Sequence, residues 1–133
     1  MDPVSISGTC VGLISLIITA TTAATRFIRT CRGAREDLTA AIGDLTQLRT
    51  TLDLLKDDDT TVIPERMRTE ILSLLDKCAI IVIEIEKLIE SLGNSRPVPV
   101  KWAASEKSKV EAARAKLRGY AESLGLTIDI VGL

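Results

Sequence analysis

Apolar residues recur every three or four positions along four stretches of the chain, which is the spacing of one buried face of an α-helix. Short polar or proline-containing segments separate these stretches. The pattern therefore predicts an all-α fold, a four-helix bundle made by a single domain, 1–133, with a long hydrophobic N-terminal helix. The helices are expected at about residues 4–31, 34–56, 64–92 and 102–124 or longer.

The third stretch carries two apolar stripes. The first alternates steps of four and three: Met67, Ile71, Leu74, Cys78, Ile81, Ile85, Leu88 and Leu92. The second lies beside it: Leu72, Leu75, Ala79, Val82 and Ile89. A helix with two stripes contacts two neighbours, so we expect it to be central, with the first stripe fully buried from Ile71 to Ile85. Pro64 is expected in its first turn and Gly93 just after its end.

The second and fourth stretches have one buried face each. In the second, the predicted buried residues are Leu38, Ala41, Leu45, Leu48, Leu52 and Leu55. In the fourth they are Val110, Ala113, Leu117, Tyr120, Leu124 and Val131. Gly119 and Gly125 each cost about 1 kcal/mol relative to alanine, so the turns after Leu124 are the weakest part of the prediction. The prolines of "NSRPVPVK" predict a loop, and the fourth helix is expected to start near Trp102.

The opening stretch has helical spacing that continues in phase into the second stretch. Its predicted buried seam is Ile6, Cys10, Leu13, Ile17, Ala20, Ala24, Phe27 and Cys31. Gly33 is the single break signal between the two stretches, so one kinked helix and a tight hairpin are both compatible with the pattern. We expect a break between Cys31 and Arg35.

The opening stretch is also uncharged from Pro3 to Thr25. A signal peptide is disfavoured because no basic residue precedes the apolar run. A membrane span is compatible with the length, since 23 helical residues reach about 34 Å against a hydrocarbon core of roughly 30 Å. Eight residues are Leu, Ile or Val but eight are Ser or Thr, so the span would be marginal. The alternative is a helix of a soluble core.

The hydroxyl-bearing and small residues of this stretch share one face. They step by three and four, and Arg26 extends the stripe: Ser5, Gly8, Gly12, Ser15, Thr19 and Thr22. A Gly-x-x-x-Gly pair lets helices approach closely in lipid, and an ordinary solvated face would carry Lys and Glu. The predicted set for membrane insertion and self-association is Ile6, Gly8, Gly12, Leu13, Ser15, Ile17 and Thr19. The competing interpretation is a core helix whose small face meets solvent or a close neighbour.

Four arginines follow the uncharged stretch: Arg26, Arg29, Arg32 and Arg35. On a helix they wind around the axis and do not form one patch. They would either cap a solvated helix end or contact the headgroups of an anionic cytoplasmic leaflet, at about 1 kcal/mol per charge.

The composition argues against several function classes. The net charge is −1 and no basic, aromatic-rich face occurs, so nucleic acid is not an expected partner. Histidine is missing, and no nucleophile motif, phosphate-binding loop or cysteine pair at zinc spacing occurs. "DDD" at 57–59 lacks the rest of a calcium loop and predicts a solvated turn. We therefore expect no enzyme activity, cofactor, metal or small-molecule substrate.

The three cysteines are interpreted as reduced, buried thiols of an intracellular protein.

Three segments resemble a known family: "MDPVSISGTCVGLISLI", "LTQLRTTLDLLKD" and "VKWAASEKSKVEAARAKLRGYAESLGLTI". They are similar to the fungal N-terminal domain of STAND proteins, in the HeLo-like (HELL) group, over residues 1 to about 130. The marks are patterns, "MDPVS" before the small-residue run and "KWA" before "LRGYAESL", and not catalytic signatures.

The resemblance implies a helical bundle at the N-terminus of receptors that resemble NOD-like receptors. Such domains are effector modules in programmed cell death, heterokaryon incompatibility and innate immunity, and their N-terminal helix targets membranes. The chain would then be cytoplasmic, relocate to the plasma membrane and self-associate, with residues 4 to about 25 as the membrane-acting element. No nucleotide-binding or repeat region follows, so we expect either a fragment or a short stand-alone protein. The alternative function is a soluble protein-interaction domain without membrane activity.

Overall fold

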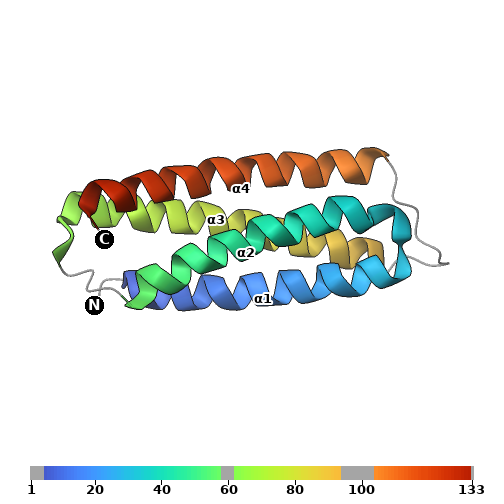
Figure 1. The fold of residues 1–133 in the computed structure, drawn as a ribbon, viewed down its shortest axis with the longest axis horizontal. Coiled ribbons are helices and arrows are strands. Elements are labelled where there is room, and N and C mark those ends of the chain that lie inside the picture. Colours follow the sequence, from blue (N-terminus) through green and yellow to red (C-terminus); the bar gives the residue numbers. More distant parts are fainter. Residues whose placement is uncertain (1–4, 58–61, 94–103, 133) are drawn as a thin grey trace.

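The computed structural model describes residues 5–57, 62–93 and 104–132. These residues form a bundle of four long α-helices, which confirms the predicted all-α fold with its long apolar N-terminal helix (Figure 1). The helices are α1 (Ile6–Thr30), α2 (Arg35–Asp57), α3 (Glu65–Gly93) and α4 (Ala104–Val131), with a short 3₁₀ turn, η1 (Arg32–Ala34), between α1 and α2.

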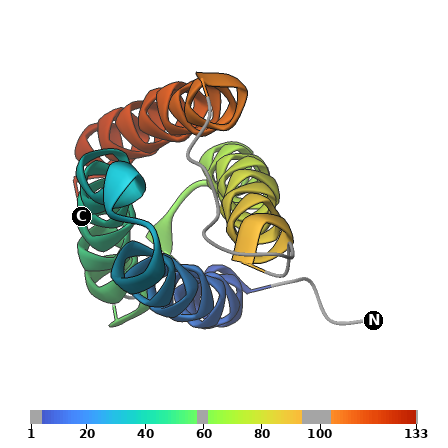
Figure 2. The ribbon, with the colours of Figure 1, turned by 90° about the vertical axis from the view of Figure 1, so that its right-hand side faces the viewer.

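The helices alternate in direction along the chain, but they do not follow chain order around the bundle. Viewed end-on, the order is α1, α2, α4, α3, so that α2 and α3 lie diagonally opposite each other (Figure 2). Helix α1 packs extensively against both α2 and α3, whereas α2 and α4 are the least closely packed of the neighbouring pairs. Helix α1 therefore covers one face of α2 and one face of α3 at the same time.

The break between α1 and α2 lies where it was predicted. Cys31 adopts an extended conformation, with φ −132° and ψ 93°, and its N–H donates to the carbonyl of Phe27 at 2.9 Å. The turn at Arg32–Ala34 then reverses the chain, and α2 begins at Arg35. Burial of Cys31 and Ala34 at the corner keeps the apolar seam continuous, which explains why the pattern stays in phase across the break.

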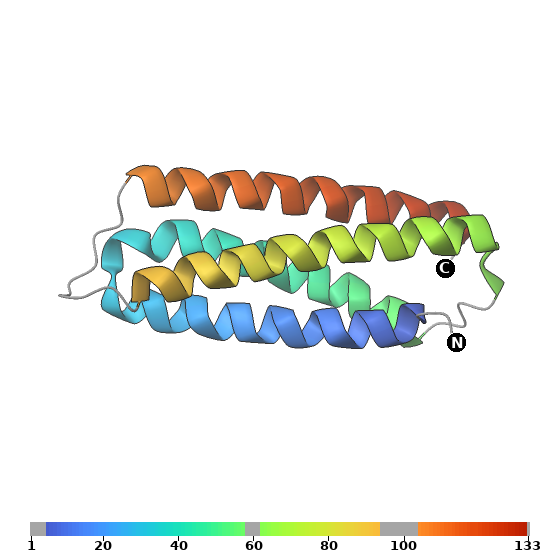
Figure 3. The ribbon, with the colours of Figure 1, turned by 180° about the vertical axis from the view of Figure 1, so that it is seen from behind.

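Helix α3 contacts two neighbours, as predicted: seen from behind, it runs between α4 and α1 (Figure 3). The five residues expected to be fully buried are all in the core: Ile71, Leu74, Cys78, Ile81 and Ile85. Of the remaining first-stripe members, Met67 and Leu88 are partly buried, and the side chain of Leu92 lies outside the described residues.

The ends of α3 differ by one residue from the prediction. Pro64 does not lie in the first turn but just before it, because the helix begins at Glu65 and the Pro64 carbonyl accepts from the N–H groups of Met67 and Arg68 at 3.0 Å each. Gly93 is the last residue of α3 and does not follow its end.

Helix α4 continues through both glycines to Val131. The predicted start near Trp102 lies outside the described residues, which resume at Ala104. On either side of Gly125 the helix is held by burial of Leu124 and of Thr127. The Thr127 hydroxyl donates to the Ser123 carbonyl at 2.9 Å. Tyr120 and Val131 are only partly buried, contrary to the prediction for the buried face. The ring of Tyr120 instead reaches the edge of the α3–α4 contact, with Lys77 Nζ 5.8 Å from its centroid.

Helix α2 buries the six residues that its pattern predicted. Its partly buried Asp44 accepts from Arg114 Nε of α4 at 2.7 Å. This ion pair joins α2 and α4, which are the least closely packed of the neighbouring helices. The predicted turn at 57–59 begins with Asp57, the last residue of α2, and the rest of it lies outside the described residues.

Candidate functional site

Helix α1 divides the predicted insertion set between two faces. Ile6, Leu13 and Ile17 are buried in the core seam. The other four members lie on the opposite, solvent-facing side: Gly8, Gly12, Ser15 and Thr19 are exposed or nearly so in the folded bundle. The structure thus brings the small residues together on one surface and keeps the large aliphatic ones away from it.

The exposed side of α1, which we call the outer face, contains more residues than the predicted stripe and is more apolar. It consists of Gly8, Val11, Gly12, Ser15, Ile18, Thr19, Thr22 and Thr25. Val11 and Ile18, which are 54% and 44% exposed, were not predicted to lie on this surface. Their separation by seven residues, two helical turns, was the signal that could have placed them on this side. The outer face therefore presents apolar side chains to water and no charge.

The threonine hydroxyl groups of the outer face are bonded within their own helix. Thr19, Thr22 and Thr25 donate to the carbonyls four residues earlier at 3.1, 2.8 and 2.9 Å. A threonine held this way needs no water or partner for its donor. The cost of moving these hydroxyls out of water is accordingly reduced.

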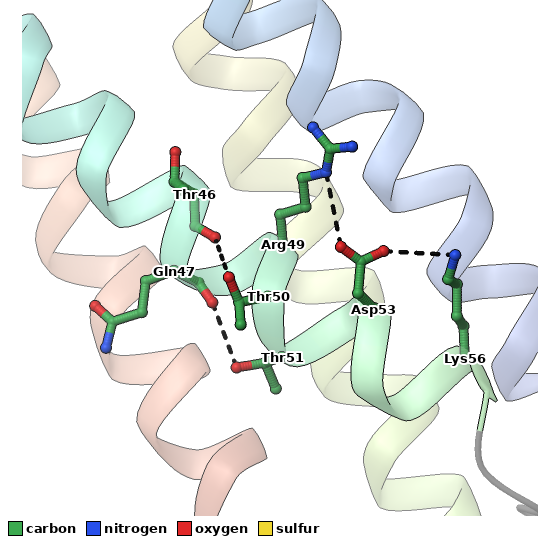
Figure 4. Close-up of polar contacts among 7 residues, drawn as sticks. All are labelled: Thr46, Gln47, Arg49, Thr50, Thr51, Asp53 and Lys56. Carbon is green, nitrogen blue, oxygen red and sulfur yellow. Dashed lines mark hydrogen bonds and ion pairs between the residues drawn. The ribbon is translucent and has the colours of Figure 1, made fainter.

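The outer face contrasts with the exposed side of α2. There the Asp53 carboxylate lies 3.9 Å from Arg49 Nε and 3.5 Å from Lys56 Nζ (Figure 4). The hydroxyls of Thr50 and Thr51, on the same helix, bond to its own carbonyls. This is the usual solvated face of a bundle helix. Over the same length α1 carries no ionisable side chain from residue 5 to 25 except buried Cys10.

The two glycines of the Gly-x-x-x-Gly pair are not equivalent. Ser5 caps α1, its Oγ accepting from the Gly8 N–H at 2.9 Å, and a Cβ added at Gly8 would lie 2.8 Å from that oxygen. A Cβ at Gly12 would meet no atom within 4 Å. Gly8 is therefore tied to the helix cap, and Gly12 is the open position on the outer face.

The four arginines separate into distinct surroundings. Arg26 and Arg29 border a shallow hollow of about 250 Å³ at the end of α1, together with Thr21, Thr22 and Thr25. Arg35 borders a different hollow, of about 440 Å³, with Gly33 and Glu36. The side chain of Arg32 is outside the described residues. Within the described part of the chain, neither Arg26 nor Arg29 forms an ion pair, so both guanidinium groups are available to an external anion.

The opposite end of α1 is tied to α2. The Ser7 hydroxyl donates to the Lys56 carbonyl at 2.9 Å. Helix α1 is long and apolar enough to cross a bilayer, judged by length and composition, yet only 28% of its most apolar window of 18 residues is buried. A core helix of a soluble protein is mostly buried, so α1 departs from that pattern through its outer face.

Other kinds of site find little support in the described residues. No group of three or more potential metal ligands comes together among them. Cys10 and Cys78 are buried in the core, and this burial raises the pKa of both thiols to about 11, so they stay protonated at neutral pH.

Comparison with protein-family models, with curated proteins and with solved structures finds no match to this chain. The resemblance to HeLo-like domains therefore rests on the sequence segments quoted above.

Proposed function

We propose that the chain is a membrane-acting helical bundle in which α1 leaves the core, inserts into a lipid bilayer and pairs with α1 of further copies. In line with the resemblance, it would serve as the N-terminal effector module of a fungal STAND-type protein and induce cell death when copies assemble. The observation that carries this proposal is the outer face of α1, which is exposed yet uncharged, with its threonine donors satisfied inside the helix.

Transfer to lipid affects the two faces of α1 differently. The buried seam, with Leu13 and Ile17, exchanges a protein core for acyl chains, which are about as apolar. The outer face moves Val11 and Ile18 out of water, which is favourable at about 25 cal/mol per Å² of apolar surface. The remaining polar surface, around Gly12 and Ser15, would be covered by a second α1 in the membrane.

The folded bundle opposes this release. Departure of α1 uncovers one face of α2 and one of α3, and each buried Leu or Ile that becomes exposed costs about 1.5–3 kcal/mol. It also breaks the bond from Ser7 to the Lys56 carbonyl. Release would consequently depend on a second event, and assembly of several copies on an anionic surface supplies one because it pairs the released helices.

The test is dye release from anionic vesicles by the wild type and by Gly12→Leu. Leucine at this open position adds apolar area, so vesicle binding should persist, but it blocks close helix pairing, so dye release should fall by about tenfold. The matched control is Gly43→Leu on α2, where an added Cβ also meets no atom within 4 Å. Dye release by Gly43→Leu should equal that of the wild type. Gly8 is left unchanged because its substitution would disturb the Ser5 cap.

Equal dye release by Gly12→Leu and the wild type would contradict pairing through the outer face. The alternative function is a soluble interaction domain, and the extensive packing of α1 against α2 and α3 supports it. It would be favoured if the wild type bound no anionic vesicle even when a fused partner forced it to oligomerise.

A further inference from the structure

The side of α4 that points away from the bundle carries a second regular pattern. Its members step by three and four, and all are exposed: Ala112, Ala115, Gly119, Glu122, Leu126 and Ile130. We call this set the α4 stripe. Small residues occupy its first half, and two large apolar residues occupy its last turns, with Leu126 64% and Ile130 75% exposed. The α4 stripe thus changes from small residues in its first half to large apolar residues near its end.

The α4 stripe takes no part in the core. Helix α4 packs against α3 and α2 through Val110, Ala113, Leu117 and Leu124, on the opposite side. At the centre of the α4 stripe, a Cβ at Gly119 would meet no atom within 4 Å, so nothing in the described residues fills the space above it. The stripe is therefore an open helix surface in the single chain.

We infer that the α4 stripe binds a second copy of the chain, with the two α4 helices antiparallel and crossing near residue 121. In this arrangement Ile130 of each copy lies over Ala112 of the other, and Leu126 lies over Ala115. Each large side chain thus meets a small one. In a parallel pair the large residues would face each other and the alanines would leave a gap, so the size pattern favours the antiparallel arrangement.

Two charged residues, Glu122 on the α4 stripe and Arg118 beside it, are self-complementary in the same arrangement. Arg118 and Glu122 lie one turn apart, are exposed, and form no ion pair within the part of the chain that the structure describes. Both border a hollow of about 300 Å³ between α2 and α4, so α2 does not close over them. Reversing the direction of the second helix brings Arg118 of each copy to Glu122 of the other. A parallel pair would bring like charges together.

This inference concerns the intact bundle and does not rest on the proposed membrane function. Self-association is measured by sedimentation equilibrium of the full chain from micromolar to millimolar concentration. We expect a reversible dimer for the wild type. Leu126→Asp should weaken it by about tenfold or more, because a carboxylate would be buried against Ala115 of the second copy. Ile80→Asp is the matched control: Ile80 is 63% exposed on α3, and its replacement should leave the dimer unchanged.

Charge reversal tests the direction of the helices. Arg118→Glu and Glu122→Arg should each weaken the dimer by about tenfold, since each puts like charges opposite one another. The double variant R118E/E122R should restore wild-type association, because it again places opposite charges across the antiparallel contact. In a parallel pair each single variant would only exchange one like-charge contact for another, so neither should weaken the dimer. A wild type that stays monomeric throughout, a dimer sensitive to Ile80→Asp and not to Leu126→Asp, or a double variant without recovery would each overturn the inference.

Discussion

Replacing Ile81 with aspartate is expected to unfold the domain. Ile81 is 4% exposed in the core, on the helix that lies between α1 and α4. A carboxylate at this position would be buried without a partner, at a cost of several kcal/mol, and such a cost is comparable with the total stability of about 5–15 kcal/mol of a small domain. Thermal and urea unfolding followed by circular dichroism should show no cooperative transition at neutral pH.

The neighbouring residue provides a matched control. Ile80 precedes Ile81 on the same helix but is 63% exposed. Ile80→Asp makes the same chemical change in water and should lower the free energy of unfolding by less than about 1 kcal/mol. A cooperative transition of wild-type stability for Ile81→Asp, or unfolding of both variants alike, would contradict the assignment of the core face of α3.

Removing two positive charges at the end of α1 is expected to weaken binding to anionic vesicles by roughly 30-fold. At about 1 kcal/mol per charge near an anionic surface, the double variant R26Q/R29Q loses about 2 kcal/mol. Neither arginine is held by an ion pair within the described residues, so the free protein should keep its fold. Vesicle partitioning at low salt measures the effect, which should shrink at 1 M salt, where the Debye length is about 3 Å.

The control for this prediction changes the same net charge elsewhere. Arg66 and Arg68 lie in the first turn of α3, at the other end of the bundle (Figure 1). R66Q/R68Q should leave partitioning within about twofold of the wild type, because these charges lie away from the proposed contact. If both double variants weakened binding equally, only the net charge of the protein would matter, and the end of α1 would not be the contact site.

Helical periodicity predicted most of the fold because each buried face was already marked by apolar spacing. The core residues of α3, the buried face of α2 and the break after Cys31 all follow from local patterns. Periodicity does not say which helix covers a face. The diagonal placement of α2 and α3, which lets α1 cover both, depends on packing between distant segments and was not predicted.

Only part of the candidate site on α1 was predicted, because spacing shows which residues share a face but not which face meets solvent. The stripe of small residues on α1 was visible in the sequence, but the exposure of Val11 and Ile18 was not, since large aliphatic residues are normally assigned to the core. Ile14, which the predicted seam did not include, is also buried and broadens the seam of α1. The difference between Gly8 and Gly12 comes from one capping side chain, Ser5, which the spacing alone does not reveal.

The most direct test of the membrane account is hydrogen–deuterium exchange of the wild type, free and bound to anionic vesicles, resolved by peptide. If α1 leaves the bundle and enters the bilayer, its amides stay protected by helix and lipid. The amides of α2 and α3, whose faces it uncovered, should exchange at least about tenfold faster. Unchanged protection in all four helices would mean that the bundle adsorbs intact, and that result would contradict the release of α1.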